Sequence, residues 1–199
     1  MQRFRIVLWV LVVVAAGAFA YLYLKPTPAP APQTQTSSMP LTSLGGPFTL
    51  VGADGKPFSS TRLAGKPYAI FFGFTNCPDV CPTTMARMVK LRQQLGAGDQ
   101  AFAIVFVTVD PERDGPTEVG TYAKAFNSPI VGLTGSPAQI EQVKKQYGIF
   151  SAKAPDESGG YSVDHTATVL LFDRSGKFAA TIAPDENDTP ALEKLRRLL

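Results

Sequence analysis

The chain has 199 residues and a formal net charge of +3, a length that suits one globular domain with an additional targeting or anchoring segment. The charge excess is small, because basic residues outnumber acidic ones by only one when Arg3 and Arg5 are left out. No stripe of lysine and arginine is visible, so the sequence argues against a nucleic-acid partner.

The first predicted element is an uncharged apolar run, residues 6–24. As a helix it would be about 28 Å long, close to the hydrocarbon core of a bilayer at roughly 30 Å. Arg3 and Arg5 precede the run, so the positive-inside rule places the following chain outside the cytoplasm, on the periplasmic side. We predict a single membrane-spanning anchor in residues 1–24. A cleaved signal peptide is the alternative, because Ala-Phe-Ala at residues 18–20 resembles a cleavage site.

A tether and a globular domain follow the predicted anchor. Residues 25–47 are rich in proline, alanine, threonine, glutamine and serine, and a segment of this composition cannot bury a core. We predict that it is semi-extended and holds the domain away from the membrane. Residues 48–199 are the predicted domain, which is extracytoplasmic under either interpretation of the N-terminus.

The domain alternates between apolar runs typical of strands and stretches with helical spacing of apolar residues. The sequence predicts strands at residues 48–51, 58–59, 68–74, 101–109, 130–133, 166–172 and 178–182, and helices at residues 83–95, 116–126, 136–147 and 190–199. The first two strands should form a hairpin, and so should the last two. Asp114 is a candidate cap for the second helix, and the glycine- and serine-rich residues 153–160 predict an excursion from these elements.

Strands joined by helices and closed by an antiparallel hairpin indicate an α/β fold. Cysteines at the first strand-to-helix turn favour the thioredoxin-like class within it. Doubly wound folds share the same alternation and are the alternative. The predicted architecture is therefore a thioredoxin-like α/β domain with an N-terminal hairpin, preceded by one membrane-spanning helix.

Cys77 and Cys81 are the only cysteines, and they lie where the strand at residues 68–74 leads into a helix. Backbone N–H groups and the helix dipole stabilise thiolates at such a position. The spacing permits a disulfide and equally allows both sulfurs to reach one metal ion. A merely structural disulfide would close too short a loop to constrain the unfolded chain much. Redox enzymes of the thioredoxin type usually have Cys-x-x-Cys, and the longer spacing here leaves room for a metal.

His165 is the only histidine, and it directly precedes the predicted strand at residues 166–172. Thioredoxin-like proteins usually carry a cis-proline at this position, facing the cysteines. If the fold is thioredoxin-like, His165 reaches Cys77 and Cys81, and we predict that it is a metal ligand. Asp164 is a candidate partner that orients the imidazole, although a solvated loop carboxylate explains this residue nearly as well.

Two thiolates and one imidazole are a donor set for a soft metal ion. A structural zinc site normally has four protein ligands, and this chain offers three. The set suits Cu(I) in trigonal geometry, and it suits Cu(II) when a water or a carboxylate is added. We therefore predict one copper ion, bound by Cys77, Cys81 and His165.

Three sequence blocks together resemble the signature of the Sco (SenC) copper-protein family. They are residues 73–82 (GFTNCPDVCP), 109–114 (VDPERD) and 163–165 (VDH), and the resemblance covers about residues 44–199. It implies a membrane-tethered thioredoxin-like domain that binds copper through two cysteines and a histidine. It also implies a role in assembling the copper A centre of cytochrome c oxidase subunit II. Thr166 stands where many relatives have serine, which is a mild departure. We expect residues 109–114 to form a wall near the site without binding metal.

Two functions from different classes fit these residues. The first is a copper chaperone, a binding protein and not an enzyme, which delivers copper to an oxidase subunit or prepares its cysteines. The second is an extracytoplasmic thiol–disulfide oxidoreductase, in which Cys77 and Cys81 form the redox pair. A copper or redox sensor is a third class, which no residue specifically supports.

Overall fold

The structure of the chain is a computed structural model that describes residue 21, residues 44–155 and residues 159–199. The predicted anchor, apart from residue 21, and most of the predicted tether lie outside the described residues. Within the described ranges, no helix combines the length and the apolar character that crossing a membrane requires.

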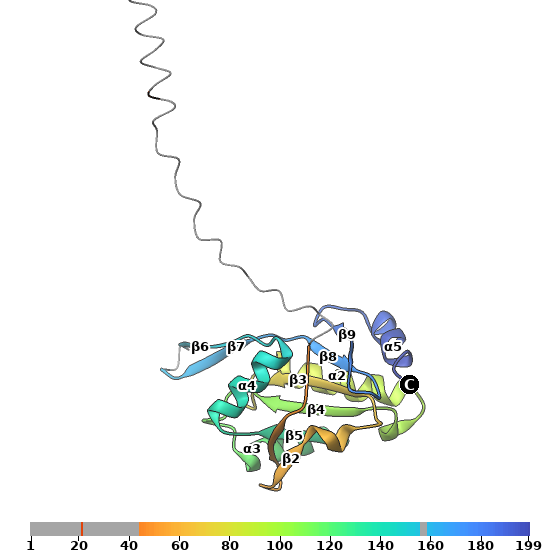
Figure 1. The fold of residues 1–199 in the computed structure, drawn as a ribbon, viewed down its shortest axis with the longest axis horizontal. Helices are drawn as coiled ribbons and strands as arrows, with labels where there is room; N and C mark the ends of the chain where they lie inside the picture. Colours follow the sequence, from red (N-terminus) through yellow and green to blue (C-terminus); the bar gives the residue numbers. More distant parts are fainter. Residues whose placement is uncertain (1–20, 22–43, 156–158) are drawn as a thin grey trace, which may run out of the picture. The chain divides into compact units, whose positions relative to one another are not determined.

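A seven-stranded mixed sheet forms the centre of the domain (Figure 1). In spatial order its strands are β2 (Pro57–Ser59), β1 (Thr49–Gly52), β5 (Ile130–Thr134), β4 (Ala103–Thr108), β3 (Tyr68–Gly73), β8 (Val169–Phe172) and β9 (Phe178–Ile182). The three central strands β5, β4 and β3 are parallel, whereas β1 and β8 run antiparallel to them. The predicted N-terminal hairpin is confirmed as β1 and β2, and the C-terminal one as β8 and β9.

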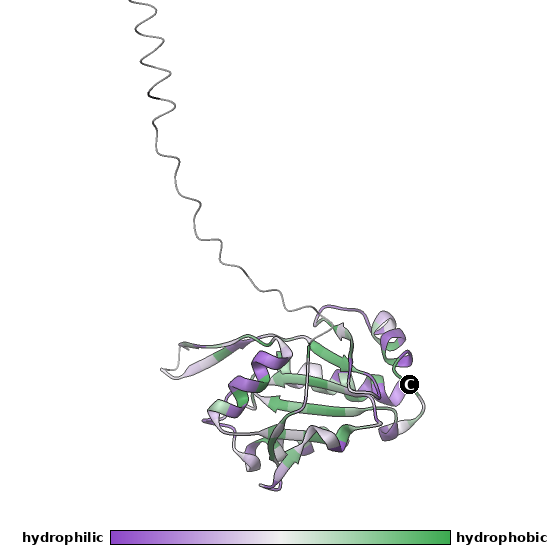
Figure 2. Cartoon of the chain, viewed as in Figure 1, coloured by the Kyte–Doolittle hydropathy of each residue, from purple (hydrophilic) through white to green (hydrophobic). Residues whose placement is uncertain are grey.

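The central strands are buried because their sequences are apolar without interruption. All residues of β3 and β8 are buried, and so are five of the six in β4. Strands covered on both faces have this composition, whereas half-exposed strands alternate. The strongly hydrophobic colouring of β3 and β4 shows the core, and polar residues gather on the surrounding helices (Figure 2).

Within residues 44–155 and 159–199, four α-helices pack around the sheet and confirm the predicted helical segments. They are α2 (Val80–Gln94), α3 (Pro116–Lys124), α4 (Pro137–Tyr147) and α5 (Asp188–Arg196), with short 3-10 helices η2 (Ser60–Leu63) and η3 (Gly98–Gln100). Helix α4 has a complete capping box, in which Ser136 and Gln139 each bond the other's backbone N–H. Gly148, whose φ of +65° is left-handed, follows the last residue of the helix as its cap.

One pair of strands was missed by the sequence prediction. β6 (Ser151–Pro155) and β7 (Tyr161–His165) form a two-stranded antiparallel sheet of their own. The hairpin extends to one side of the domain (Figure 1). β6 (SAKAP) has no β-branched or aromatic residue and ends in proline, so it lacks the composition typical of a strand. The predicted excursion at residues 153–160 therefore overlaps the hairpin and the connection between its strands.

Three local predictions differ from the structure. β8 starts at Val169 and not at residue 166. His165 is the last residue of β7, and three residues separate it from β8. Helix α2 starts at Val80, which brings Cys81 into its first turn. Asp114 is not the cap of α3: Gly115 occupies that position without a side-chain bond. The carboxylate of Asp114 instead accepts hydrogen bonds from Thr75 and Thr108. The α/β thioredoxin-like class itself is confirmed, with the cysteines at the junction of β3 and α2.

Candidate metal centre

The two cysteines occupy different structural positions at the junction of β3 and α2. Cys77 lies in the connecting turn, where its N–H donates to the carbonyl oxygen of Phe74 at 3.3 Å. Cys81 is the second residue of α2. Its backbone N–H donates to the sulfur of Cys77 at 3.4 Å. An N–H at a helix N-terminus that points at a sulfur stabilises negative charge on it.

Cys81 is completely buried, and Gly73 makes room for its sulfur. A Cβ atom at Gly73 would lie 2.8 Å from the Sγ of Cys81 and 2.9 Å from the ring of Phe71. Any other residue at this position would therefore displace the thiol or the ring. Burial raises the pKa of the Cys81 thiol strongly, and the hydrogen bond with Cys77 raises it further.

His165 approaches Cys81 from β7, on the other side of the site. Its Nε2 lies 3.4 Å from the sulfur of Cys81, and its Nδ1 lies 3.1 Å from the carbonyl oxygen of Thr166. A carbonyl only accepts, so Nδ1 carries the proton and the lone pair of Nε2 faces the sulfur. This tautomer presents to the cysteines the nitrogen that binds a metal.

Aromatic rings enclose the imidazole. The rings of Phe71 and Phe74 each contact it in T-shaped geometry, with 5.8 Å between ring centroids. Burial among them lowers the pKa of His165, while the hydrogen bond to Thr166 and the nearby charge of Asp164 act in the opposite direction. The imidazole is therefore neutral at neutral pH, which is the protonation state required of a ligand.

Cys77, Cys81 and His165 thus come together as the sequence predicted. The two sulfurs and a ring nitrogen all lie within 4.8 Å of one another. In the described part of the chain they are the only group of at least three cysteine, histidine or acidic side chains that could hold a metal ion. Both cysteines are free thiols, and Cys77 and His165 are partly exposed. The site is consequently accessible from solvent beside Cys77 and His165, where a metal ion can enter.

Asp164 does not orient the imidazole through a hydrogen bond, contrary to the suggestion from sequence. Nδ1 is bonded to the Thr166 carbonyl instead, and Asp164 is exposed. Thr166 has a second role, because its hydroxyl accepts the backbone N–H of Phe150 at 3.1 Å and fixes the base of the hairpin. A serine would carry the same hydroxyl, so the departure at this residue preserves the bond.

The segment at residues 109–114 supports the loop that leads to Cys77. Asp114 is 1% exposed. Its carboxylate accepts the backbone N–H of Thr75 at 2.9 Å and the hydroxyls of Thr75 and Thr108 at 2.6 Å each. Sequence reasoning missed this role. The acidic residues of the segment are the available signal, but a sequence does not reveal which donors a buried carboxylate meets.

The fold and the site together define a class: a thioredoxin-like domain with an open two-cysteine, one-histidine metal centre. A family model described as SCO1/SenC matches residues 36–199. A SCO2-like protein of Rickettsia conorii is 35% identical over 155 residues, which cover 77% of this chain and 76% of that protein. The chain belongs to the SCO1/SenC family.

Solved structures of related proteins have the same fold. ScoI of Bradyrhizobium japonicum, solved with copper bound, is 38% identical, with a TM-score of 0.70 over 78% of this chain and 99% of that one. BsSco is described as having a disulfide switch and as a member of the Sco family of cytochrome c oxidase assembly proteins. It is 29% identical, with a TM-score of 0.60 over 79% of this chain and 94% of that one.

Proposed function

We propose that this chain is a copper chaperone for cytochrome c oxidase assembly, and that Cys77, Cys81 and His165 are its copper ligands. One observation carries the proposal: two sulfurs and a ring nitrogen of His165, from distant parts of the sequence, converge within 4.8 Å. The donor set fits copper by its chemistry, because thiolates and imidazole are ligands that copper prefers. Copper bound to a related ScoI supports the same assignment.

The openness of the site supports transfer rather than permanent storage. Copper is the cargo in this proposal, and the acceptor is the copper A site of oxidase subunit II. A thiolate of the acceptor enters on the exposed side, next to Cys77, and one donor cysteine leaves. Ligand exchange of this kind requires reduced cysteines, so copper loading and thiol redox state are coupled.

Thiol–disulfide exchange is the second candidate function, and the free thiols support it. Cys77 is the partly exposed sulfur, and it accepts the N–H of Cys81 at the start of α2. An exposed sulfur with such a donor is the better attacking thiolate, which makes Cys81 the resolving cysteine. The disulfide switch described for BsSco is consistent with this chemistry.

Membrane attachment is part of the proposal and rests on the sequence alone. The uncharged run at residues 6–24 with its basic flank favours an N-terminal anchor that leaves the domain on the periplasmic side. A reporter fused after Leu199 should then be active only outside the cytoplasm, and the protein should fractionate with membranes. A soluble product that begins near residue 21 would establish a cleaved signal peptide instead.

His165→Ala separates the two functions, with Cys77→Ser as its comparison. A copper chaperone needs the imidazole, so both variants should lose oxidase copper loading at matched protein levels. A thiol reductase needs sulfur but no imidazole, so His165→Ala should then retain most oxidase activity while Cys77→Ser fails. Near-normal oxidase activity with His165→Ala at low copper contradicts the chaperone proposal.

A further inference from the structure

His165 is carried by a hairpin that is separate from the main sheet. β6 and β7 pair with each other and with no strand of the seven-stranded sheet. Backbone ladder bonds, which fix neighbouring strands in a sheet, therefore do not fix the hairpin on the domain. Cys77 and Cys81 lie outside the hairpin. The distance from the imidazole to the sulfurs consequently depends on the side chains that hold β7 in place.

The inward face of β7 makes these contacts. Side chains alternate along a strand, so Tyr161, Val163 and His165 share one face. Val163 is buried in the core, and His165 packs against Phe71 and Phe74. Tyr161 lies at the opposite end of the strand from His165. The contacts that hold Tyr161 therefore also fix the orientation of β7 relative to the metal centre.

Tyr161 is held by a clamp, which we define as Asp110, Arg113 and Tyr161. Arg113 Nη1 donates to the carbonyl oxygen of Tyr161 at 2.8 Å, and its guanidinium carbon lies 3.9 Å from the centre of the Tyr161 ring. The Tyr161 hydroxyl donates to Oδ1 of Asp110 at 3.0 Å. Arg113 Nε donates to the other oxygen of this carboxylate. Because Asp110 is 1% exposed, the clamp is anchored on a buried group just after β4.

Arg113 also connects the clamp to Phe74, an aromatic residue that lines the metal centre. Its guanidinium carbon lies 5.8 Å from the centre of the Phe74 ring, and Phe74 contacts the imidazole of His165. The same guanidinium therefore touches both a residue of β7 and a residue that packs on the ligand.

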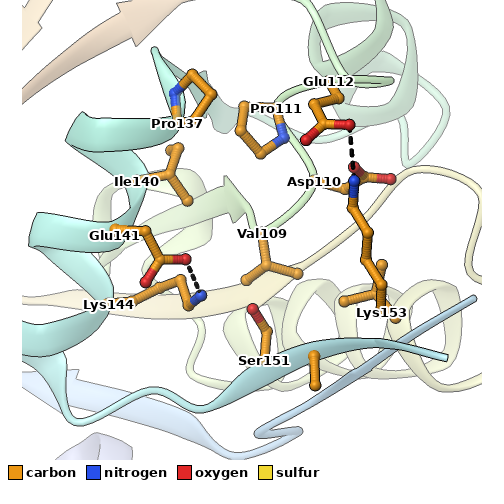
Figure 3. A pocket seen from close by; sticks show the side chains of 12 residues that line it. Val109, Asp110, Pro111, Glu112, Pro137, Ile140, Glu141, Lys144, Ser151 and Lys153 are labelled. Carbon is orange, nitrogen blue, oxygen red and sulfur yellow. Dashed lines mark hydrogen bonds and ion pairs between the residues drawn. The ribbon is translucent and has the colours of Figure 1, made fainter.

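Beside Asp110 of the clamp, a pocket separates part of the hairpin from the domain. A cavity of about 150 Å³ lies between the segment after β4, helix α4 and strand β6, lined in part by residues 109–112 and 151–153 (Figure 3). Unfilled space provides no van der Waals contact. Lys153 and Glu112 form an ion pair of 2.6 Å, but exposed pairs of this kind contribute little. The clamp is thus the better attachment of β7, and it holds the end of the strand opposite His165.

We propose that Asp110, Arg113 and Tyr161 are positioning residues for copper binding. The clamp holds β7 so that Nε2 of His165 faces the sulfurs before copper arrives. Copper binding then costs no free energy for reordering the hairpin. Without the clamp, the hairpin samples positions in which only the two sulfurs face the ion. The proposal rests on the proposed copper-binding function, but the placement of His165 is a property of the metal-free protein.

Two conservative variants of the full-length chain test the clamp. Arg113→Lys keeps the charge and removes the flat guanidinium that stacks and donates to the backbone. Tyr161→Phe keeps the ring and removes only the hydroxyl bond to Asp110. We expect copper affinity to fall about tenfold or more in Arg113→Lys, in the range usual for residues that support metal ligands, and less in Tyr161→Phe. Ser162→Ala, on the face of β7 opposite Tyr161, is the matched control on the same hairpin and should bind copper as the unaltered chain does.

A double-mutant cycle shows whether the clamp acts through His165. In the His165→Ala background, Arg113→Lys should weaken copper binding no further, because the ligand that the clamp positions is already absent. Nitrogen hyperfine structure in the spectrum of the Cu(II) form should also weaken in Arg113→Lys alone. A loss of affinity that is as large with His165→Ala as without it overturns the proposal.

A metal-free measurement separates this proposal from the proposed function. The rings of Phe71 and Phe74 should shift the nuclear magnetic resonance signals of the His165 ring protons, and Arg113→Lys should move these signals toward the positions of an unpacked histidine. Tyr161→Phe should cause a smaller change and Ser162→Ala none. If the unaltered chain binds no copper, the proposed function fails, and the ring signals still decide the placement of His165. Signals that stay unchanged in both clamp variants, with thermal unfolding confirming that these are folded, overturn the proposal.

Discussion

The surroundings of Cys81 control the competition between protons and copper at the site. Its thiol is buried, its pKa is raised, and its sulfur faces an imidazole whose pKa is lowered. At neutral pH the thiol is therefore protonated and the imidazole is neutral. Copper binding must release the proton of Cys81, whereas Nε2 of His165 is available without losing one.

The pH dependence of copper affinity follows from these states. Because the raised pKa keeps Cys81 protonated across the neutral range, each copper ion displaces at least this one proton. The apparent copper affinity of the reduced protein should rise about tenfold or more per pH unit between roughly pH 7 and 9. A competition titration with a copper chelator whose own pH dependence is known measures this. A flat profile would contradict a buried, protonated Cys81.

Gly73→Ala tests the packing around the same sulfur. The added Cβ would clash with the Sγ of Cys81 and with the ring of Phe71, and overpacking of this kind typically lowers the free energy of unfolding by about 1–3 kcal/mol. Copper affinity should fall as well, because the sulfur moves. Urea denaturation and copper titration measure the two effects. A variant with unchanged stability and affinity would show that the sulfur has free space beside Gly73.

At the scale of elements, hydrogen bonds between segments hold the connection from β3 to α2 in place. The connection is short and carries Cys77, and the buried carboxylate of Asp114 binds both the backbone and the side chain of Thr75 within it. A third bond comes from Thr108 at the end of β4. The neighbouring central strands thus jointly set the position of the first cysteine.

Asp114→Asn should loosen this connection. An amide replaces one accepting oxygen with a donor, so at least one of the three donors around it loses its acceptor while buried. We expect the free energy of unfolding to fall by about 1–3 kcal/mol, and backbone amides near Thr75 to exchange faster with solvent. Glu112→Gln removes an exposed ion pair and is the control, with an expected change of about 1 kcal/mol or less. Equal stability of both variants would contradict the support role of Asp114.

At the scale of the whole molecule, residues 44–199 contain the sheet, the helices that cover it and all three candidate ligands. The start of this fragment is attached to helix α4, because the N–H of Gly45 donates to the carbonyl oxygen of Gln146 at 2.8 Å. We expect the fragment to unfold in one cooperative transition and, when reduced, to bind one copper ion. Copper uptake by the disulfide form equal to that of the reduced form would argue against binding through two thiolates.

Sequence alone was sufficient for the elements whose signals are local. Apolar runs predicted β3, β4 and β9, helical spacing and caps predicted α4, and two cysteines at a strand-to-helix turn indicated the thioredoxin-like class. Each of these signals depends on neighbours within a few residues, so the amino-acid sequence contains all of them. The three candidate ligands were also identified, because the chain has no other cysteine or histidine.

Only the tertiary structure decided how those residues meet. The β6–β7 hairpin has a weak local pattern, and His165 ends one of its strands instead of preceding β8. Asp114 binds the loop before Cys77 instead of capping α3, and the Thr166 carbonyl rather than Asp164 orients the imidazole. The bond of Asp114 joins residues that are distant in sequence, and the bond of His165 depends on the direction in which the neighbouring backbone carbonyl points. A buried polar group takes whichever donor or acceptor the fold brings to it, and periodicity along the chain does not contain that information.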